Sequence, residues 1–202
     1  RLVDNHSWNH HSGMAGGGSS NLVFLDLYPY FDLLWRGEGF SNNTPADFWL
    51  VERSGLPFGV AGEMLGRGNP FRGLLFGMTD RWGWGGNPIG LWKFFDATKL
   101  NEGEFWGWWD DTNPITATGS AEVKASLWKT PTGTVLVLAN FANAAQKVSL
   151  VADHAKLGFP LVDTAWTQPE IPAAQKTGTV PNLAQPFEIP AGGGFIWVHP
   201  KN

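Results

Sequence analysis

The chain has 202 residues, 12 of them tryptophan, a formal net charge of −4 and no cysteine. Mild acidity with scattered lysines and arginines forms no basic stripe, so no nucleic-acid partner is expected. The lack of cysteine excludes a disulfide scaffold and a thiolate metal site. No apolar run approaches the roughly 20 residues of a spanning helix, so no membrane partner is expected. Because the first residue is Arg1, we expect a processed chain or part of a longer polypeptide.

Short apolar runs alternate with helix signals over residues 1–103. Strands are predicted to begin at Leu2 and to cover 33–35 and 58–61, and helices are predicted over 21–30, 45–54, 70–79 and 88–100. Helix starts are indicated by Thr44 before Pro45, Asn69 before Pro70 and Asn87 before Pro88. This alternation predicts parallel strands joined by right-handed crossovers.

Three such units are fewer than the eight of a closed (β/α)8 barrel. An open doubly wound sheet lacks support because its phosphate fingerprint is missing. We therefore predict that residues 1–103 are the last β/α units of a TIM-type barrel, completed by the rest of the polypeptide or by a companion chain.

Residues 104–202 have the pattern of an antiparallel β-sandwich. Strands are predicted over 123–128, 134–140, 147–151, 161–166, 187–189 and 195–198. The segment Thr130-Pro131-Thr132-Gly133 predicts a hairpin between the first two. The aromatic motif EFWGWWDD at 104–111 is assigned mainly to packing, because large aromatic rings dominate burial.

Carboxylates follow the predicted parallel strands at the ends where ligands bind in such folds. Asp4, Glu38 and Glu63 are the candidate catalytic residues. In a glycosidase one carboxylic acid protonates the leaving oxygen, while a second attacks the sugar or activates water. The alternative is a purely structural role, in which each glutamate is a loop or salt-bridge residue.

Residues of other types near these ends suit a sugar site. The candidate substrate-binding residues are His6, Trp8, Trp35, Arg36 and Trp82. Aromatic faces stack on sugar rings, and a guanidinium can hold a carboxylate or hydroxyl. Trp82 lies in a glycine-rich loop, where the ligand-facing and structural interpretations are equally weighted.

Neither a metal nor a cofactor is expected. The histidines His6, His10 and His11 lack the spacing of helix-borne zinc ligands. Gly16-Gly17-Gly18 is followed by no Lys-Ser or Lys-Thr pair, so it does not indicate a phosphate loop. Asn5 and Asn42 match the glycosylation sequon.

The segments NLVFLDLYPYFDLLWRGEGF, PADFWLVERSGLPFGVAGEML, NPFRGLLFGMTDR and NPIGLWKFFDATKL resemble the C-terminal part of a group of glycoside-hydrolase domain proteins similar to glycoside hydrolase family 123. The resemblance implies a barrel ending in its last strands and then a C-terminal β-sandwich. On that mapping Asp4–His6, Glu38 and Glu63 belong to roughly the sixth, seventh and eighth strands. The family's catalytic Asp-Glu pair has no match in this sequence, so the resemblance implies that it lies upstream of Arg1.

The resulting hypothesis is a glycoside hydrolase-like protein that acts on or binds a carbohydrate and is extracellular or lumenal. One alternative is a catalytically inactive structural or assembly glycoprotein built on the same fold. Another is a carbohydrate-binding module in which residues 104–202 bind the glycan.

Overall fold

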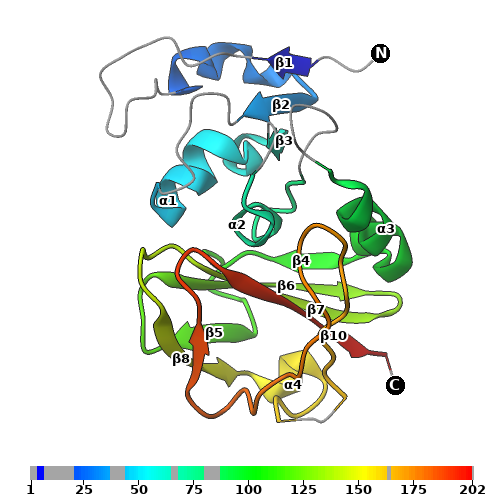
Figure 1. The fold of residues 1–202 in the computed structure, drawn as a ribbon. Coiled ribbons are helices and arrows are strands. Elements are labelled where there is room, and N and C mark those ends of the chain that lie inside the picture. The colour runs from blue at the N-terminus through cyan, green and yellow to red at the C-terminus, as the bar shows by residue number, and fades with distance from the viewer. Residues whose placement is uncertain are drawn as a thin grey trace. The chain divides into compact units, whose positions relative to one another are not determined.

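A computed structural model describes residues 4–6, 21–36, 44–64, 68–79, 87–162 and 165–201 (Figure 1). The chain divides into two compact units, Arg1–Pro88 and Ile89–Asn202. The boundary predicted from the sequence lies fifteen residues later, after residue 103. Helix α3 (Ile89–Thr98) and the short 3-10 helix η4 (Leu100–Glu102) therefore belong to the β-rich second unit.

The first unit is built on a parallel sheet of three strands in the order β1 (Asp4–His6), β2 (Leu33–Arg36) and β3 (Ala61–Met64). Between β1 and β2 the chain forms the 3-10 helix η1 (Asn21–Tyr30). Between β2 and β3 it forms α1 (Ala46–Phe48), which continues as the π-helical segment η2 (Trp49–Arg53). The predicted alternation of parallel strands and helices is therefore present.

The third strand lies three residues later than the sequence predicts. Residues predicted to begin it form the 3-10 helix η3 (Leu56–Phe58). Gly55 (φ +69°) and Gly59 (φ +72°) flank η3 in the left-handed conformation, which glycine adopts without the steric cost of a Cβ. The prediction of 58–61 is wrong because these two glycines add a turn before the sheet.

The predicted helix over 70–79 is shorter in the structure, where α2 spans Pro70–Leu74. Its predicted cap is confirmed, because the Asn69 side chain accepts a hydrogen bond of 3.0 Å from the backbone N–H of Arg72. The chain then turns through Gly77 (φ +70°). The backbone N–H of Met64 donates to the carbonyl of Thr79, so the chain after α2 returns beside the end of β3.

The second unit contains two antiparallel sheets, seen as separate layers in Figure 1. The larger has the order β10 (Gly194–Pro200), β7 (Gly133–Asn140), β6 (Val123–Thr130) and β4 (Glu104–Trp106). The smaller has the order β5 (Ile115–Thr118), β8 (Gln146–Ala152) and β9 (Phe187–Ile189). The hairpin of β6 and β7 is confirmed, with Pro131 and Thr132 as its turn.

One apolar core joins the inner faces of the two sheets. Its members come from β5, β6, β7, β8, β9 and β10 and include Ile115, Leu127, Leu136, Leu150 and Trp197. β7 lies between β6 and β10 and is buried at all eight positions. This arrangement, in which both sheets bury one face in a shared core, is that of a β-sandwich.

The strand predicted over 161–166 is wrong for the described residues. The helix α4 (His154–Leu157) precedes this segment, and Leu161 and Trp166 lie in turns and irregular chain. Both side chains nevertheless belong to the core, and the Trp166 indole N–H donates to the Leu161 carbonyl. The apolar pattern therefore marks burial rather than strand pairing.

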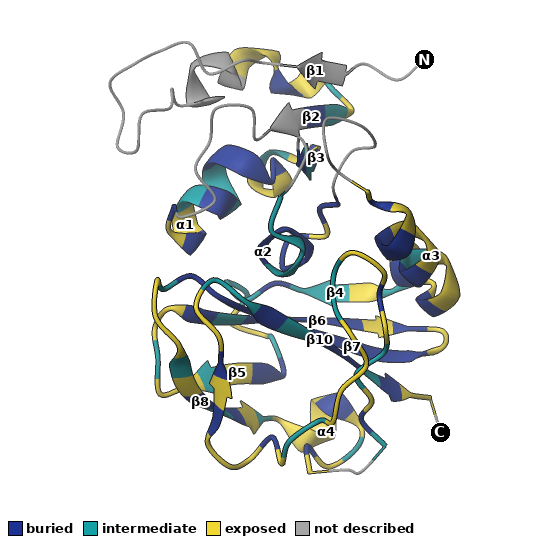
Figure 2. Ribbon diagram, viewed as in Figure 1, coloured by how far each residue is buried: buried dark blue, intermediate teal, exposed yellow. Residues whose placement is uncertain are grey.

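Helix α3 is amphipathic, with buried and exposed residues on opposite sides in Figure 2. Its buried residues are Gly90, Leu91, Phe94 and Thr98. A Cβ on Gly90 would come 2.2 Å from the Pro172 carbonyl oxygen, so this contact requires glycine. No helix within the described ranges has the length and apolar character needed to cross a membrane.

Candidate functional site

The parallel register of the first unit places three candidate residues in one row. His6 on β1 is the partner of Trp35 on β2, and Trp35 is the partner of Glu63 on β3. Neighbouring strands in a sheet lie roughly 5 Å apart. Residues far apart in the chain are therefore brought to one level of the sheet.

The opposite face of the sheet is the one that carries the helices. Leu34, in the row next to Trp35, is 1% exposed and packs with Tyr28 and Val60. A Cβ on Gly62, the partner of Leu34, would lie 2.5 Å from the carbonyl oxygen of Arg53 in η2. Since successive residues of a strand alternate between faces, positions 6, 35 and 63 belong to the face away from these helices.

The helical layer contains buried positive charge. The Arg53 guanidinium lies 3.8 Å from the centroid of the Trp49 ring, and Trp49 stacks on Phe76. Arg53 and Arg72 are each 1% exposed. A guanidinium over a tryptophan face in a desolvated setting contributes about 2 kcal/mol. Neither arginine was predicted to have a role from the sequence.

Some predicted site residues are located by backbone register alone. Asp4 is paired with Leu33 and lies two positions before His6, which puts it on the same face as His6. Asn5 lies on the alternate face, and Arg36 is the partner of Met64 at the end of β2. Glu63 itself is partly buried.

Other predicted residues lie outside the described part of the chain. These are Trp8, Glu38, Asn42 and Trp82. Within the described ranges, no group of three or more histidine, aspartate or glutamate side chains is close enough together to hold a metal ion.

The aromatic motif at 104–111 has a second feature that was not predicted from the sequence. Trp106 packs against the sandwich core, and Phe105 lies 4.4 Å from Trp128 between ring centroids. Trp108, however, lines a cavity of about 150 Å³ together with Asp110 and Lys124. The two aspartates directly after Trp108 and Trp109 were a signal for such a site, but the residues across the cavity come from later strands.

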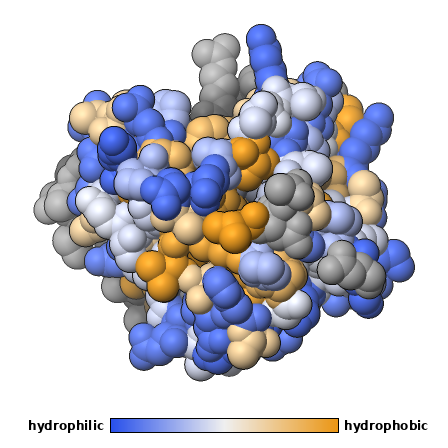
Figure 3. Space-filling model, turned by 90° about the horizontal axis from the view of Figure 1, so that it is seen from below, coloured by the Kyte–Doolittle hydropathy of each residue, from blue (hydrophilic) through white to orange (hydrophobic). Residues whose placement is uncertain are grey.

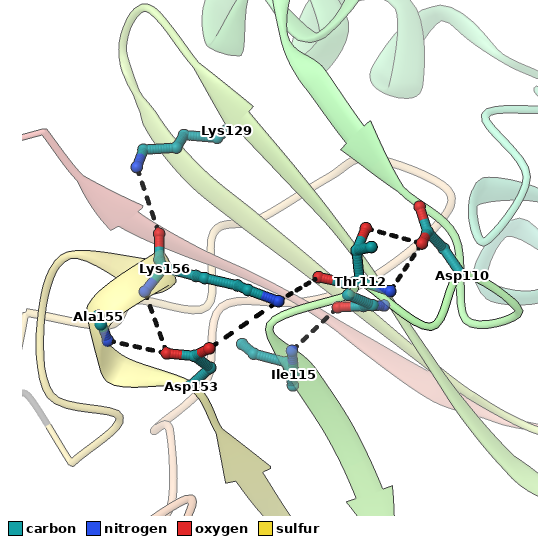
Figure 4. Close-up of polar contacts among 8 residues, drawn as sticks. Asp110, Thr112, Ile115, Lys129, Asp153, Ala155 and Lys156 are labelled. Atoms are coloured by element: carbon teal, nitrogen blue, oxygen red, sulfur yellow. Dashed lines mark hydrogen bonds and ion pairs between the residues drawn. The ribbon is translucent and has the colours of Figure 1, made fainter.

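The carboxylate of Asp110 is held by the next turn of the chain. Its Oδ1 accepts hydrogen bonds from the Thr112 hydroxyl at 2.7 Å and from the Thr112 backbone N–H at 2.8 Å (Figure 4). The hydroxyl bond, then the backbone bond, lower the pKa of Asp110 below its usual value, and the charge of Lys156 acts in the same direction. Asp110 is therefore ionised at neutral pH.

The second unit also has an apolar hollow. Leu161, Val162, Trp166, Val180 and Pro181 line a cavity of about 260 Å³. Val162 remains 52% exposed. On the face drawn in Figure 3, apolar side chains gather in a patch ringed by polar ones.

Comparison with protein families finds two matches that together span nearly the whole chain. Residues 1–83 match the model described as "Glycoside hydrolase 123, TIM-barrel domain". Residues 87–199 match the model described as "Glycoside hydrolase 123, C-terminal domain". A search of curated proteins finds no match. The two family matches follow one another along the chain and correspond to the two structural units. The chain therefore belongs to glycoside hydrolase family 123.

Proposed function

We propose that the first unit supplies the last β/α units of a (β/α)8 barrel and that the strand face away from the helices lines a carbohydrate-binding rim. The observation that carries this proposal is the row His6, Trp35 and Glu63 across three parallel strands. Ligands bind at the carboxyl ends of such strands. The remaining strands come from elsewhere in the polypeptide or from a companion chain.

Within this rim, Glu63 and Glu38 are the proposed carboxylates and Asp4 a third. A carboxylate can accept two hydroxyl hydrogen bonds, or, when protonated, donate to a glycosidic oxygen. Trp35 with Trp8 and Trp82 would offer aromatic faces to the sugar, and Arg36 and His6 polar contacts. We assign these groups to substrate binding and orientation, and O-glycosyl hydrolysis to the complete barrel.

The test uses the full-length protein with Glu63→Gln and Glu38→Gln. Each variant should lower kcat/KM for glycoside hydrolysis, or glycan affinity, about tenfold or more, since a charge-assisted hydrogen bond contributes about 1.5–3 kcal/mol. The measurements are release of sugar from aryl glycosides and binding to a glycan array.

Glu188→Gln is the matched control, because Glu188 is an exposed glutamate on a strand of the second unit. Unchanged hydrolysis and unchanged glycan binding in both rim variants would contradict the assignment. Glycan binding without hydrolysis in the unaltered full-length protein would favour the non-catalytic glycoprotein instead.

A further inference from the structure

We propose that the C-terminal domain carries its own binding site for a single carbohydrate unit, formed by Trp108, Asp110 and Lys124. These residues line the 150 Å³ cavity at the end of the aromatic motif. Such a volume holds several water molecules or one sugar ring. Every lining residue belongs to the second unit, so the site is independent of the proposed barrel rim.

The polar groups of the cavity require a ligand that both donates and accepts hydrogen bonds. Both hydrogen bonds from Thr112 use Oδ1 of Asp110, which leaves Oδ2 to accept from a ligand. The Lys124 ammonium can only donate, and the hydroxyl of Thr116 in the same lining can do both, whereas the Ser120 hydroxyl already donates to Gln146 Oε1. Hydroxyl groups on a ring satisfy such a mixed set.

The same charges disfavour simple ions. The Asp110 carboxylate repels a phosphate or sulfate, and the Lys124 ammonium repels a metal cation. A neutral polyhydroxylated ligand meets neither repulsion. The Trp108 ring adds an apolar wall suited to the C–H face of a sugar.

Trp108 differs from the buried tryptophans of the sandwich core. The indole N–H of Trp166 donates to the Leu161 carbonyl, and that of Trp197 donates to Gln168 Oε1 at 3.0 Å. The indole nitrogen of Trp108 is buried but has no acceptor among the described residues. An unsatisfied buried donor is unfavourable, and this distinguishes Trp108 from Trp166 and Trp197.

The group that covers Trp108 can move. The Lys124 Nζ lies 4.3 Å from the centroid of the Trp108 ring. Lysine has a long flexible side chain, so its ammonium can leave the ring face and donate to a ligand hydroxyl instead. A sugar would therefore replace the cation over the ring while keeping Lys124 as a partner.

The loop that carries Trp108 and Asp110 is held in place by hydrogen bonds. Two successive turns are closed by Asp110 N–H to the Gly107 carbonyl and by Asn113 N–H to the Asp110 carbonyl. The Asn113 side-chain amide donates to the carbonyls of Gly107 and Ala125, each at 3.1 Å, and so ties the loop to β6. Such a preorganised loop loses little conformational freedom when a ligand binds.

The experiment is a titration of the full chain, labelled with nitrogen-15, with methyl glycosides of neutral hexoses and N-acetylhexosamines. The indole N–H resonance of Trp108 is assigned by its absence in Trp108→Phe. We expect at least one glycoside to shift this resonance saturably with a Kd in the millimolar range, typical of a single sugar ring. Asp110→Asn and Lys124→Met should each weaken that binding at least tenfold.

Asp111→Asn is the matched control, since Asp111 is the exposed neighbour of Asp110 and does not line the cavity. It should bind like the unaltered chain, and Glu63→Gln should also, which separates this site from the rim. The proposal is overturned if no glycoside causes a saturable shift, if glycerol acts as strongly as the sugars, or if both cavity variants bind normally.

Discussion

Thr112 is the residue that most lowers the pKa of Asp110. One threonine supplies both hydrogen bonds to the carboxylate, through its hydroxyl and its backbone N–H. Lys156 adds a favourable charge, and its Nζ donates to the Thr112 carbonyl at 3.4 Å while lying 3.9 Å from Asp153 (Figure 4). The turn at 110–113 is thereby linked to the start of α4.

Thr112→Val should raise the pKa of Asp110 toward its usual value. The substitution removes the hydroxyl hydrogen bond, which is the largest cause of the lowered pKa, and keeps the backbone bond. The measurement is a carboxyl carbon-13 titration by NMR. Thr118→Val is the control, because its hydroxyl donates to the Ser149 carbonyl instead. An unaltered Asp110 pKa in Thr112→Val would contradict the assignment.

The hydrogen bonds between Thr112 and Asp110 also affect how stability depends on pH. Because the folded-state pKa of Asp110 is lower than the unfolded one, its contribution is present above the unfolded pKa. It is lost as the pH falls through the folded pKa. Thr112→Val should therefore make the loss of stability less steep as the pH falls below the ordinary pKa of an aspartate, as measured by urea unfolding at several acidic pH values.

The Asn140 side chain connects several secondary-structure elements of the second unit. It is fully buried at the end of β7, and its side-chain nitrogen donates to the carbonyls of Ala144, Ile189 and Pro190. Its side-chain oxygen accepts from the backbone N–H of Ala142. One amide therefore holds the β7–β8 connection and the end of β9, which belongs to the other sheet.

Asn140→Asp should lower the free energy of unfolding by about 3 kcal/mol, because a carboxylate cannot donate to the three carbonyls that accept from the Asn140 amide. The measurement is equilibrium unfolding in urea. Asn182→Asp is the matched control, since exposed Asn182 only accepts, from the Ala184 N–H, and aspartate retains that acceptor. The control should stay within about 0.5 kcal/mol of the unaltered chain. Equal stabilities for the two variants would be inconsistent with this role of Asn140.

Strand β7 lies inside the larger sheet of the second unit. It pairs with β6 on one side and with β10 on the other, and no residue of it is exposed. The edge strands β4 and β9 have three residues each. Local opening is easiest where backbone hydrogen bonds and apolar contacts are few.

Hydrogen–deuterium exchange followed by mass spectrometry should therefore show the slowest exchange in peptides covering 133–140. Peptides covering 104–106 and 187–189 should exchange faster, because those strands lie at sheet edges. If β7 exchanged as fast as the edge strands, the prediction that β7 is the most protected strand would be wrong.

Much of this architecture follows from local sequence patterns. The alternation of apolar runs and helix signals predicted the parallel arrangement, and Asn69 before Pro70 predicted the cap of α2, which the structure confirms. The hairpin around Pro131 and the final strands were also predicted correctly. Each of these depends on residues close together in the chain.

Tertiary structure decided what depends on pairing between distant segments. Because Gly55 and Gly59 adopt the left-handed conformation, the third strand begins later in the chain than predicted. Trp166 is part of the core although it belongs to no strand. The row of His6, Trp35 and Glu63, and the cavity joining Trp108 to Lys124, arise from strand register and sheet packing. The sequence by itself determined the family, the order of most elements and the candidate carboxylates. The fold alone decided which residues meet, because register and packing are set by contacts that no local pattern contains.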